Sequence, residues 1–103
     1  MGFLELFFGV KEKTLQQFLD KEALLLDVCS SREFEANHIA GAIHVPLKML
    51  RSKLPELKAM QKPFIVYCES GVRSATATKL LQKNHIEAIN GGGWRRLTKR
   101  LKF

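Results

Sequence analysis

Short apolar runs alternate with amphipathic stretches along the chain. Four of these runs predict β-strands, at residues 23–28, 42–45, 64–68 and 86–89. The run at 64–68 gives the strongest signal because it combines β-branched and aromatic residues. Nearly unbroken apolar runs of this length are typical of strands that are covered on both faces in a parallel sheet.

Helix signals lie between these strands and after the last one. Helices are expected at residues 14–21, at 30–37, in pieces over 47–57, at 74–83 and at 94–102. Two capping boxes support the first two helices, Thr14 with Gln17 and Ser30 with Glu33. Ser74 is expected to cap the fourth. The first helix should bury one apolar side, formed by Leu15, Phe18 and Leu19.

Strands that alternate with helices predict βαβ units, and therefore an α/β fold with a parallel sheet. A turn over residues 90–93 is expected to join the last strand to the last helix. The chain has 103 residues and contains no internal repeat or long linker. We therefore expect a single domain over residues 1–103, with a core large enough to need no metal or crosslink.

The composition is that of an ordinary globular domain, with 46% hydrophobic and 26% charged residues. It excludes the disordered, collagenous and disulfide-scaffold classes. Seventeen Lys and Arg against ten Asp and Glu give a formal charge of +7 and a pI near 9.7. This balance favours anionic partners such as small anions, RNA or acidic carrier proteins.

Five positive charges and no negative charge fall within residues 94–102. At helical spacing Trp94, Leu97 and Leu101 share one side, so this segment is predicted to pack on the core with its cations in solvent. Docking of a partner protein and binding of RNA are the alternatives. Nucleic acid is not expected as the primary partner, because aromatic residues are not interleaved with the cations as stacking platforms.

Two cysteines, Cys29 and Cys68, are too few for a disulfide framework and lack metal-ligand spacing with the histidines. The chain is therefore expected to work in the reducing cytoplasm without a metal. Its apolar N-terminal segment lacks a basic region and is interrupted by Glu5, so neither a signal peptide nor a membrane span is expected. The aromatic residues of that segment are predicted to pack on the core, with an exposed contact surface as the alternative: Phe3, Phe7 and Phe8.

Cys68 stands at the carboxyl end of the strongest predicted strand, directly before a predicted helix. Ligands of open parallel α/β sheets bind at this edge. A thiol that faces a helix N-terminus and an arginine, here Arg73, is driven toward the reactive thiolate. Gly71 permits a tight turn, and the small Ser70 and Ser74 keep backbone amides accessible. The loop is therefore expected to form a ring of amides that holds an anion or a thiolate.

Three segments resemble parts of one known family, and they follow one another in the same order as in that family. Residues 68–74, Cys-Glu-Ser-Gly-Val-Arg-Ser, look like the active-site loop of the rhodanese family of sulfurtransferases. Residues 27–46 are similar to the family's Asp-Val-Arg…His-Ile-x-Gly-Ala stretch, and residues 92–94 resemble its glycine–tryptophan turn. The resemblance implies a rhodanese-like α/β fold, with a central parallel sheet of about five strands and helices on both faces.

The resemblance also implies a sulfurtransferase that works in two half-reactions. The Cys68 thiolate would attack the outer sulfur of a donor such as thiosulfate, become a persulfide, and pass that sulfur to a thiophilic acceptor. Cyanide, a thiol or a sulfur-carrier protein would serve as the acceptor, and no metal or organic cofactor is required. The expected state is a monomer without membrane contact.

Individual residues receive roles from the same resemblance. Cys68 is the expected nucleophile, and Arg73 is expected to stabilise anionic sulfur. The donor is expected to meet the loop and the rim of the pocket, at Glu69, Ser70, Gly71, Val72, Ser74, Arg32 and Glu33. Asp27 and His38 correspond to structural positions, where the carboxylate orders backbone and the histidine is a hydrogen-bonded anchor.

Two residues depart from the family pattern. Cys29 follows Asp-Val where the family has arginine, so one cation at the pocket edge is missing. Its thiol is interpreted as a spare small residue, with resolution of the persulfide as the alternative. Glu69 is interpreted as a solvent-pointing side chain; the functional alternative is selection against small dianions, and weak turnover of thiosulfate is expected. His44 and His85 carry no functional signal.

Two other functions stay open. The first is a non-catalytic binding or regulatory module, although such modules typically lose the nucleophile, which is present here. The second is a phosphatase or arsenate reductase, which the loop length disfavours: four residues separate Cys68 from Arg73, whereas the phosphatases of this fold use five. A phosphoryl group with three equatorial oxygens requires the wider ring.

Overall fold

A computed structural model describes residues 9–101 of the chain. The strands in this range are β1 (Leu24–Asp27), β2 (Ile43–His44), β3 (Phe64–Cys68) and β4 (Ala88–Gly93). The helices are α2 (Glu12–Asp20), α3 (Ser31–Ala36), the 3₁₀ turn η1 (Leu47–Met49), α4 (Leu50–Ala59), α5 (Val72–Lys83) and α6 (Trp94–Leu101). The predicted packing of Phe3, Phe7 and Phe8 lies outside the described residues.

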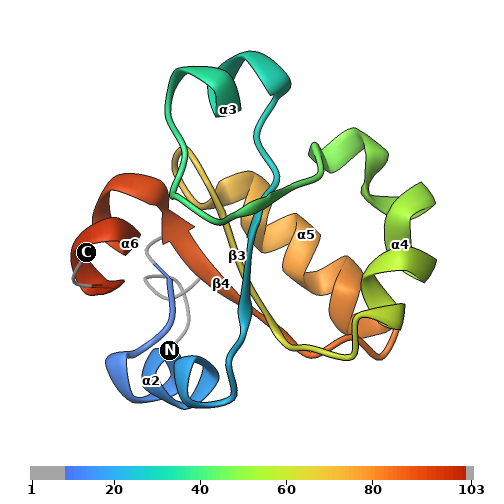
Figure 1. Cartoon of the computed structure of the whole chain (residues 1–103), viewed down its shortest axis with the longest axis horizontal. Coiled ribbons are helices and arrows are strands. Elements are labelled where there is room, and N and C mark those ends of the chain that lie inside the picture. Colours follow the sequence, from blue (N-terminus) through green and yellow to red (C-terminus); the bar gives the residue numbers. More distant parts are fainter. Residues whose placement is uncertain (1–8, 102–103) are drawn as a thin grey trace.

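The strands form one parallel sheet in the order β2-β1-β3-β4. The α/β class is therefore confirmed, and within residues 9–101 the sheet has four strands where about five were expected. Every residue of β3 is buried, which accounts for its strong apolar signal. Because all strands run in the same direction, their carboxyl ends meet at one edge, where α3 and the loop between β3 and α5 also lie (Figure 1).

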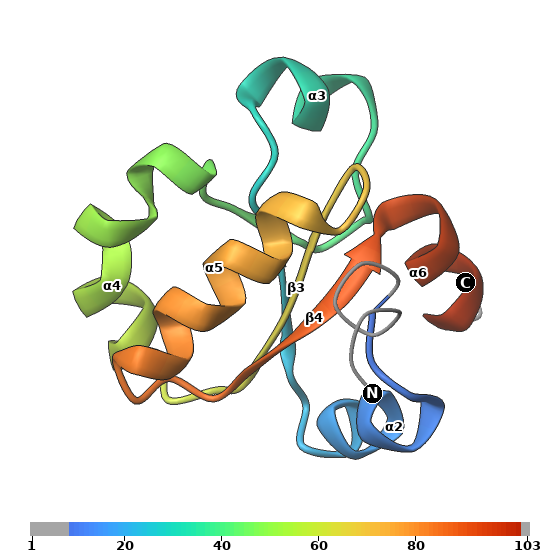
Figure 2. The same cartoon turned by 180° about the vertical axis from the view of Figure 1, so that it is seen from behind.

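Successive residues of β3 face two separate apolar layers. Phe64, Val66 and Cys68 belong to the cluster that includes α4 and α5. Ile65 and Tyr67 belong to the cluster that includes α2 and α6. Figures 1 and 2 show these two pairs of helices on opposite sides of the strands. Helices on both faces of the sheet are thus confirmed, and both faces of β3 are covered.

One of the two predicted capping boxes forms. Ser30 caps α3, with Glu33 N donating to Ser30 Oγ at 3.3 Å and Ser30 N donating to Glu33 Oε1 at 2.9 Å. The box predicted at Thr14 is wrong, because α2 begins before this residue and no side chain caps it. The Lys11 carbonyl already accepts a helical hydrogen bond, from Leu15 N at 3.0 Å, so Thr14 lies inside the helix.

The other helices follow the predicted pattern closely. The pieces predicted over residues 47–57 are η1 and α4, and α4 contains Pro55. The predicted tail helix is α6, in which Leu97 is fully buried. Trp94 and Leu101 are partly buried against the same cluster, as the helical spacing predicted.

The turn predicted over residues 90–93 is wrong, because these residues complete β4. Gly93 pairs with Cys68 at the end of β3. A β carbon on Gly93 would lie 2.7 Å from the carbonyl oxygen of Glu69, so glycine is required where these two backbone segments approach each other closely. Pairing with β3 therefore overrides the weak strand propensity of glycine, and it brings the start of α6 beside the loop that follows Cys68.

Candidate active site

The loop after β3 leads directly into α5. Its N-cap residue is Gly71, with φ of 95°, and not Ser74 as predicted. Such a left-handed conformation costs a residue with a β carbon about 1–2 kcal/mol of conformational energy, so glycine suits this position. Ser74 lies in the first turn of α5 and is fully buried. Its hydroxyl donates to Asn90 Oδ1 at 2.7 Å and caps no helix N–H.

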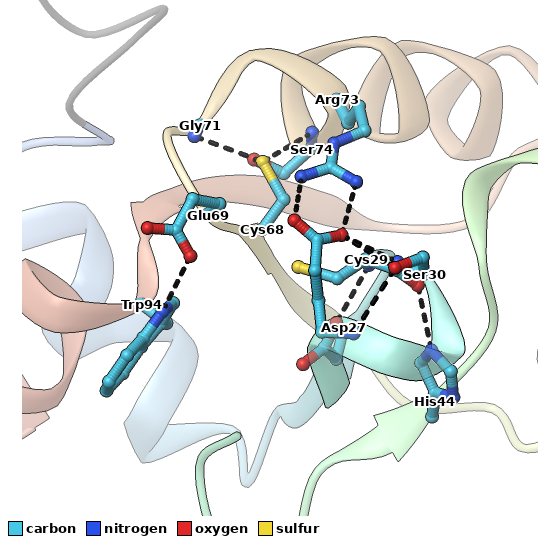
Figure 3. Close-up of polar contacts among 11 residues, drawn as sticks. Asp27, Cys29, Ser30, His44, Cys68, Glu69, Gly71, Arg73, Ser74 and Trp94 are labelled. Atoms are coloured by element: carbon cyan, nitrogen blue, oxygen red, sulfur yellow. Dashed lines mark hydrogen bonds and ion pairs between the residues drawn. The ribbon is translucent and has the colours of Figure 1, made fainter. Parts of the chain in front are cut away.

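Backbone amides of this loop donate to the sulfur of Cys68. Gly71 N lies 3.0 Å from Sγ and Ser74 N lies 3.4 Å from it (Figure 3). Both amides are at the N-terminus of the 12-residue helix α5, whose dipole adds positive potential there. Converging N–H groups at a helix N-terminus are the surroundings that stabilise a thiolate.

The Ser74 hydroxyl is a third group at the sulfur, with Oγ 3.4 Å from Sγ. It has one proton, which it can give either to Asn90 Oδ1 or to the sulfur. Asn90 is itself fixed, because its Nδ2 donates to Gly71 O at 3.1 Å and its Oδ1 accepts from Gly92 N at 2.9 Å. The sequence reasoning missed Asn90. Its only signal is a polar residue before a glycine run at the end of a strand.

The Cys68 side chain has no exposed surface. Glu69 and Ser70 of the same loop are exposed, whereas Gly71 is buried. The sulfur therefore lies beneath its own loop, with apolar residues of β3 and α5 on its inner side.

Arg73 and Glu33 form a two-pronged ion pair that joins α5 to α3. Arg73 NH1 donates to Glu33 Oε1 at 2.7 Å and NH2 donates to Oε2 at 3.0 Å (Figure 3). Hydrogen bonding to the guanidinium, and then to Ser30, lowers the pKa of Glu33 to about 2. The same pair raises the pKa of Arg73, and the sulfurs of Cys29 and Cys68 add smaller effects of the same sign. The hydrogen bonds of the guanidinium are thus made with Glu33.

Glu69 is bound to the start of α6 and does not project freely into solvent. Trp94 Nε1 donates to Glu69 Oε1 at 3.1 Å, and Arg95 donates to Oε2. The hydrogen bond from Arg95, followed by that from Trp94, lowers the pKa of Glu69. The side chain is 44% exposed, as the solvent-pointing interpretation expected, but its carboxylate is held by these two hydrogen bonds. The Glu69 carboxylate, one residue after Cys68, is thus compensated by the Arg95 cation.

Asp27 orders backbone at the end of β1, as expected. Its Oδ1 accepts from Cys29 N at 2.8 Å, and its Oδ2 is buried with no hydrogen-bond donor among the described residues. Cys29 is 3% exposed and forms no disulfide. Burial, with the nearby Asp27 charge, raises the pKa of the Cys29 thiol to about 12. A thiol that stays protonated is a poor nucleophile, which disfavours the resolving role for Cys29.

The histidines of this edge are structural in their contacts. His38 is exposed, its Nδ1 lies 2.7 Å from Phe34 O, and its ring stacks on Phe34 at 3.8 Å. His44, which carried no signal in the sequence, stacks on the same ring at 4.3 Å, and its Nε2 lies 2.8 Å from Cys29 O. These contacts hold α3 against the ends of β1 and β2. Arg32 is exposed on α3.

Comparison with known proteins agrees with this geometry. The family model described as "Rhodanese-like domain" matches residues 11–99. The chain belongs to the rhodanese-like domain family. The resemblance found in the sequence and the rhodanese-like α/β fold are thereby confirmed.

Two relatives of this rhodanese-like domain come from Bacillus subtilis, and one of them has a name linked to sulfur. The uncharacterized protein YqhL of Bacillus subtilis is 39% identical over 75 residues, 70% of this chain and 59% of YqhL. The putative sulfur carrier protein YrkF of the same species is 31% identical over 86 residues, 79% of this chain and 46% of YrkF. The chain thus spans about half the length of these two curated relatives.

A solved structure gives the same comparison at the level of the fold. The human single-domain sulfurtransferase TSTD1 superposes on this rhodanese-like domain with a TM-score of 0.63 at 28% identity. The match covers 84% of this chain and 91% of TSTD1. The protein is therefore a sulfurtransferase-related domain by family.

Residues 9–101 contain neither a metal-binding cluster nor a membrane-spanning helix. No group of three or more His, Cys, Asp or Glu side chains in this range is arranged to hold a metal ion. Within the same range no helix is long and apolar enough to cross a membrane.

Proposed function

We propose that this rhodanese-like domain transfers sulfane sulfur through a persulfide on Cys68. The observation that carries the proposal is the convergence of Gly71 N and Ser74 N on Sγ at the N-terminus of α5. These donors stabilise the thiolate, which is the attacking form of cysteine. The membership of the family and the likeness to a sulfurtransferase support the same chemistry.

In the first half-reaction the Cys68 thiolate attacks the outer sulfur of the donor. With thiosulfate, an S–S bond forms to Cys68, the S–S bond of thiosulfate breaks, and sulfite leaves with the bonding electron pair. In the second half-reaction an acceptor thiolate or cyanide attacks the outer sulfur of the persulfide. Cys68 then leaves as a thiolate, and the acceptor becomes a persulfide or thiocyanate. Neither step needs an external oxidant or reductant.

The proposed roles of the neighbouring residues follow from their positions. Arg73 contributes positive potential near the sulfur while Glu33 fixes its direction. The loop amides of Glu69, Ser70, Gly71 and Val72 would meet the transferred sulfur, with Ser74 beneath it. Because Cys68 has no exposed surface, the donor gains access only when the loop over it opens. This burial supports slow turnover of thiosulfate.

The mass of the intact protein tests the proposal. After incubation with thiosulfate or another sulfane donor, the wild type is expected to gain one sulfur atom, and cyanide is expected to remove it as thiocyanate. Cys68→Ser should gain none. Cys29→Ser is the matched control, since its buried neutral thiol takes no part, and it should gain the sulfur like the wild type. No adduct with any donor would refute the proposal.

The full burial of Cys68 favours a second candidate, a binding or regulatory module without catalysis. In that case no sulfane donor modifies the protein, and Cys68→Ser leaves its interactions unchanged. Phosphatase activity is disfavoured further, because Arg73 makes its hydrogen bonds with Glu33 and is not directed at a phosphate site. Hydrolysis of a phosphate ester that disappears in Cys68→Ser would reverse this assignment.

A further inference from the structure

The exposed face of α6 is strongly basic. The helix carries four cations, Arg95, Arg96, Lys99 and Arg100, and no acidic residue. The first three are exposed, while Arg100 turns inward to Glu12 and to the carbonyl of Val10. The packing of Leu97 on the core fixes this orientation, so the cations are held on one side of the helix.

This face is hollowed where α6 lies against α2. A groove of about 600 Å³ is lined by Glu12, Arg95, Arg96, Lys99 and Arg100. Four of the five lining residues are cations. The groove therefore has a net positive charge despite Glu12, and a concave surface with a net charge attracts an oppositely charged partner.

The basic face also begins beside the catalytic loop. Gly93 pairs with Cys68 in the sheet, and α6 starts at the next residue. Arg95 donates to Glu69, the residue that follows Cys68 (Figure 3 shows Glu69 turned toward the start of α6). A molecule bound along α6 therefore lies next to the loop that covers the sulfur.

We propose that the basic face of α6, formed by Arg95, Arg96 and Lys99, docks an acidic partner protein that carries the acceptor thiol. This inference rests on the sulfurtransferase function proposed above and names its acceptor. The partner thiolate attacks the outer sulfur of the Cys68 persulfide, the bond from that sulfur to Sγ breaks, and Cys68 is released as a thiolate. A carboxylate of the partner that binds Arg95 competes with Glu69, which links docking to the loop over Cys68.

An acidic protein fits this surface better than RNA does. Trp94 is the aromatic residue at this face, and its indole N–H is held by Glu69. Its ring is covered by the Arg95 guanidinium, 4.7 Å from the ring centre, so it offers no free platform for a base. The Glu12 carboxylate in the groove opposes a continuous phosphate backbone, whereas a protein partner can place a neutral or basic residue there.

The test uses three synthetic peptides of equal length, rich in Glu, Gln or Lys, each ending in one cysteine. Binding of the alkylated peptides is measured by fluorescence anisotropy, and sulfur transfer to the free thiols is measured by mass. The Glu peptide is expected to bind and to accept sulfur at least about tenfold better than the Gln peptide at low salt. High salt should remove this advantage, since exposed charges are screened.

Two charge-reversed variants separate a docking surface from a general effect of net charge. Arg96→Glu/Lys99→Glu should lose the preference for the Glu peptide by about tenfold or more. Lys79→Glu/Lys83→Glu changes the net charge equally on exposed positions of α5, on the opposite side of the sheet, and should keep the preference. Transfer to cyanide should be unchanged in both variants, because neither touches the sulfur.

Two results would overturn the docking proposal: equal losses in the two variants, or tighter binding of an RNA oligonucleotide of matched charge that depends on Arg96 and Lys99. Failure of the proposed function is recognised separately. If no persulfide forms on Cys68, the anisotropy measurement with alkylated peptides still reports whether α6 docks an acidic partner.

Discussion

Replacing Gly71 with alanine separates two roles of this glycine. Its φ of 95° is strained for any residue with a β carbon, and its N–H is the shorter of the two backbone donors to Cys68 Sγ, at 3.0 Å. The alanine variant is expected to relieve part of its strain by rotating the peptide unit. The rotation turns the N–H away from the sulfur.

The two effects have different magnitudes and different measurements. The left-handed conformation should lower the free energy of unfolding by about 1–2 kcal/mol. Loss of a hydrogen bond to a charged group costs about 1.5–3 kcal/mol, and about 1.4 kcal/mol corresponds to a factor of ten. Formation of the Cys68 persulfide is therefore expected to slow by about tenfold to a hundredfold.

Gly41→Ala is the matched control for the strain. Gly41 has φ of 87°, and a β carbon there meets no heavy atom within 4 Å. Both variants should lose similar stability in urea unfolding, but only Gly71→Ala should slow the time course of persulfide formation followed by mass. If Gly71→Ala is destabilised like the control and still reacts at the wild-type rate, the Gly71 amide does not support the thiolate.

Three further predictions concern pH and packing. The pKa of Glu33 is about 2, so its ion pair with Arg73 stabilises the fold above pH 4.5, and this contribution is lost as the pH falls toward 2. Glu33→Gln should therefore lose less stability than the wild type over that interval in urea unfolding, and parallel curves would contradict the ion pair. The pKa of Cys29 is raised from 9.0 to about 12, so the unfolded chain ionises first and wild-type stability should fall as the pH rises from 9 toward 12. Cys29→Ala should flatten this alkaline loss; an unchanged slope would mean that the thiol titrates normally. Leu97→Ala should lower the free energy of unfolding by about 2–5 kcal/mol, because this side chain of α6 is fully buried against the core. A much smaller loss would contradict that packing.

Local signals in the sequence were sufficient for most elements. β3 begins and ends where its apolar run predicted, and α3 has the predicted capping box at Ser30. The signals at Thr14 and Ser74 failed because a hydroxyl caps a helix only if the tertiary structure leaves it facing the free N–H groups. Ser74 instead faces Asn90 on β4. Local propensity predicts a turn at residues 90–93 because the pairing of these residues with β3 is not visible in it.

The candidate site divides in the same way. The loop from Cys68 to Ser74 is contiguous, so its amides could be placed around the sulfur from the sequence. The ion pairs could not, because Arg73 is 40 residues from Glu33, and Arg95 is 26 residues from Glu69. Only the completed sheet brings α3 and α6 to the two sides of the loop.

These ion pairs between residues far apart in the sequence change the electrostatic field that is expected at the sulfur of Cys68. The sequence suggested that Arg73 stabilises the thiolate and that Glu69 opposes an incoming anion. In the folded chain each of these charges has a partner of opposite sign, so their fields at Sγ partly cancel. The donors that remain uncompensated are the backbone N–H groups of Gly71 and Ser74 and the dipole of α5. The reactivity of Cys68 should therefore depend more on the backbone conformation of its loop than on either charged side chain.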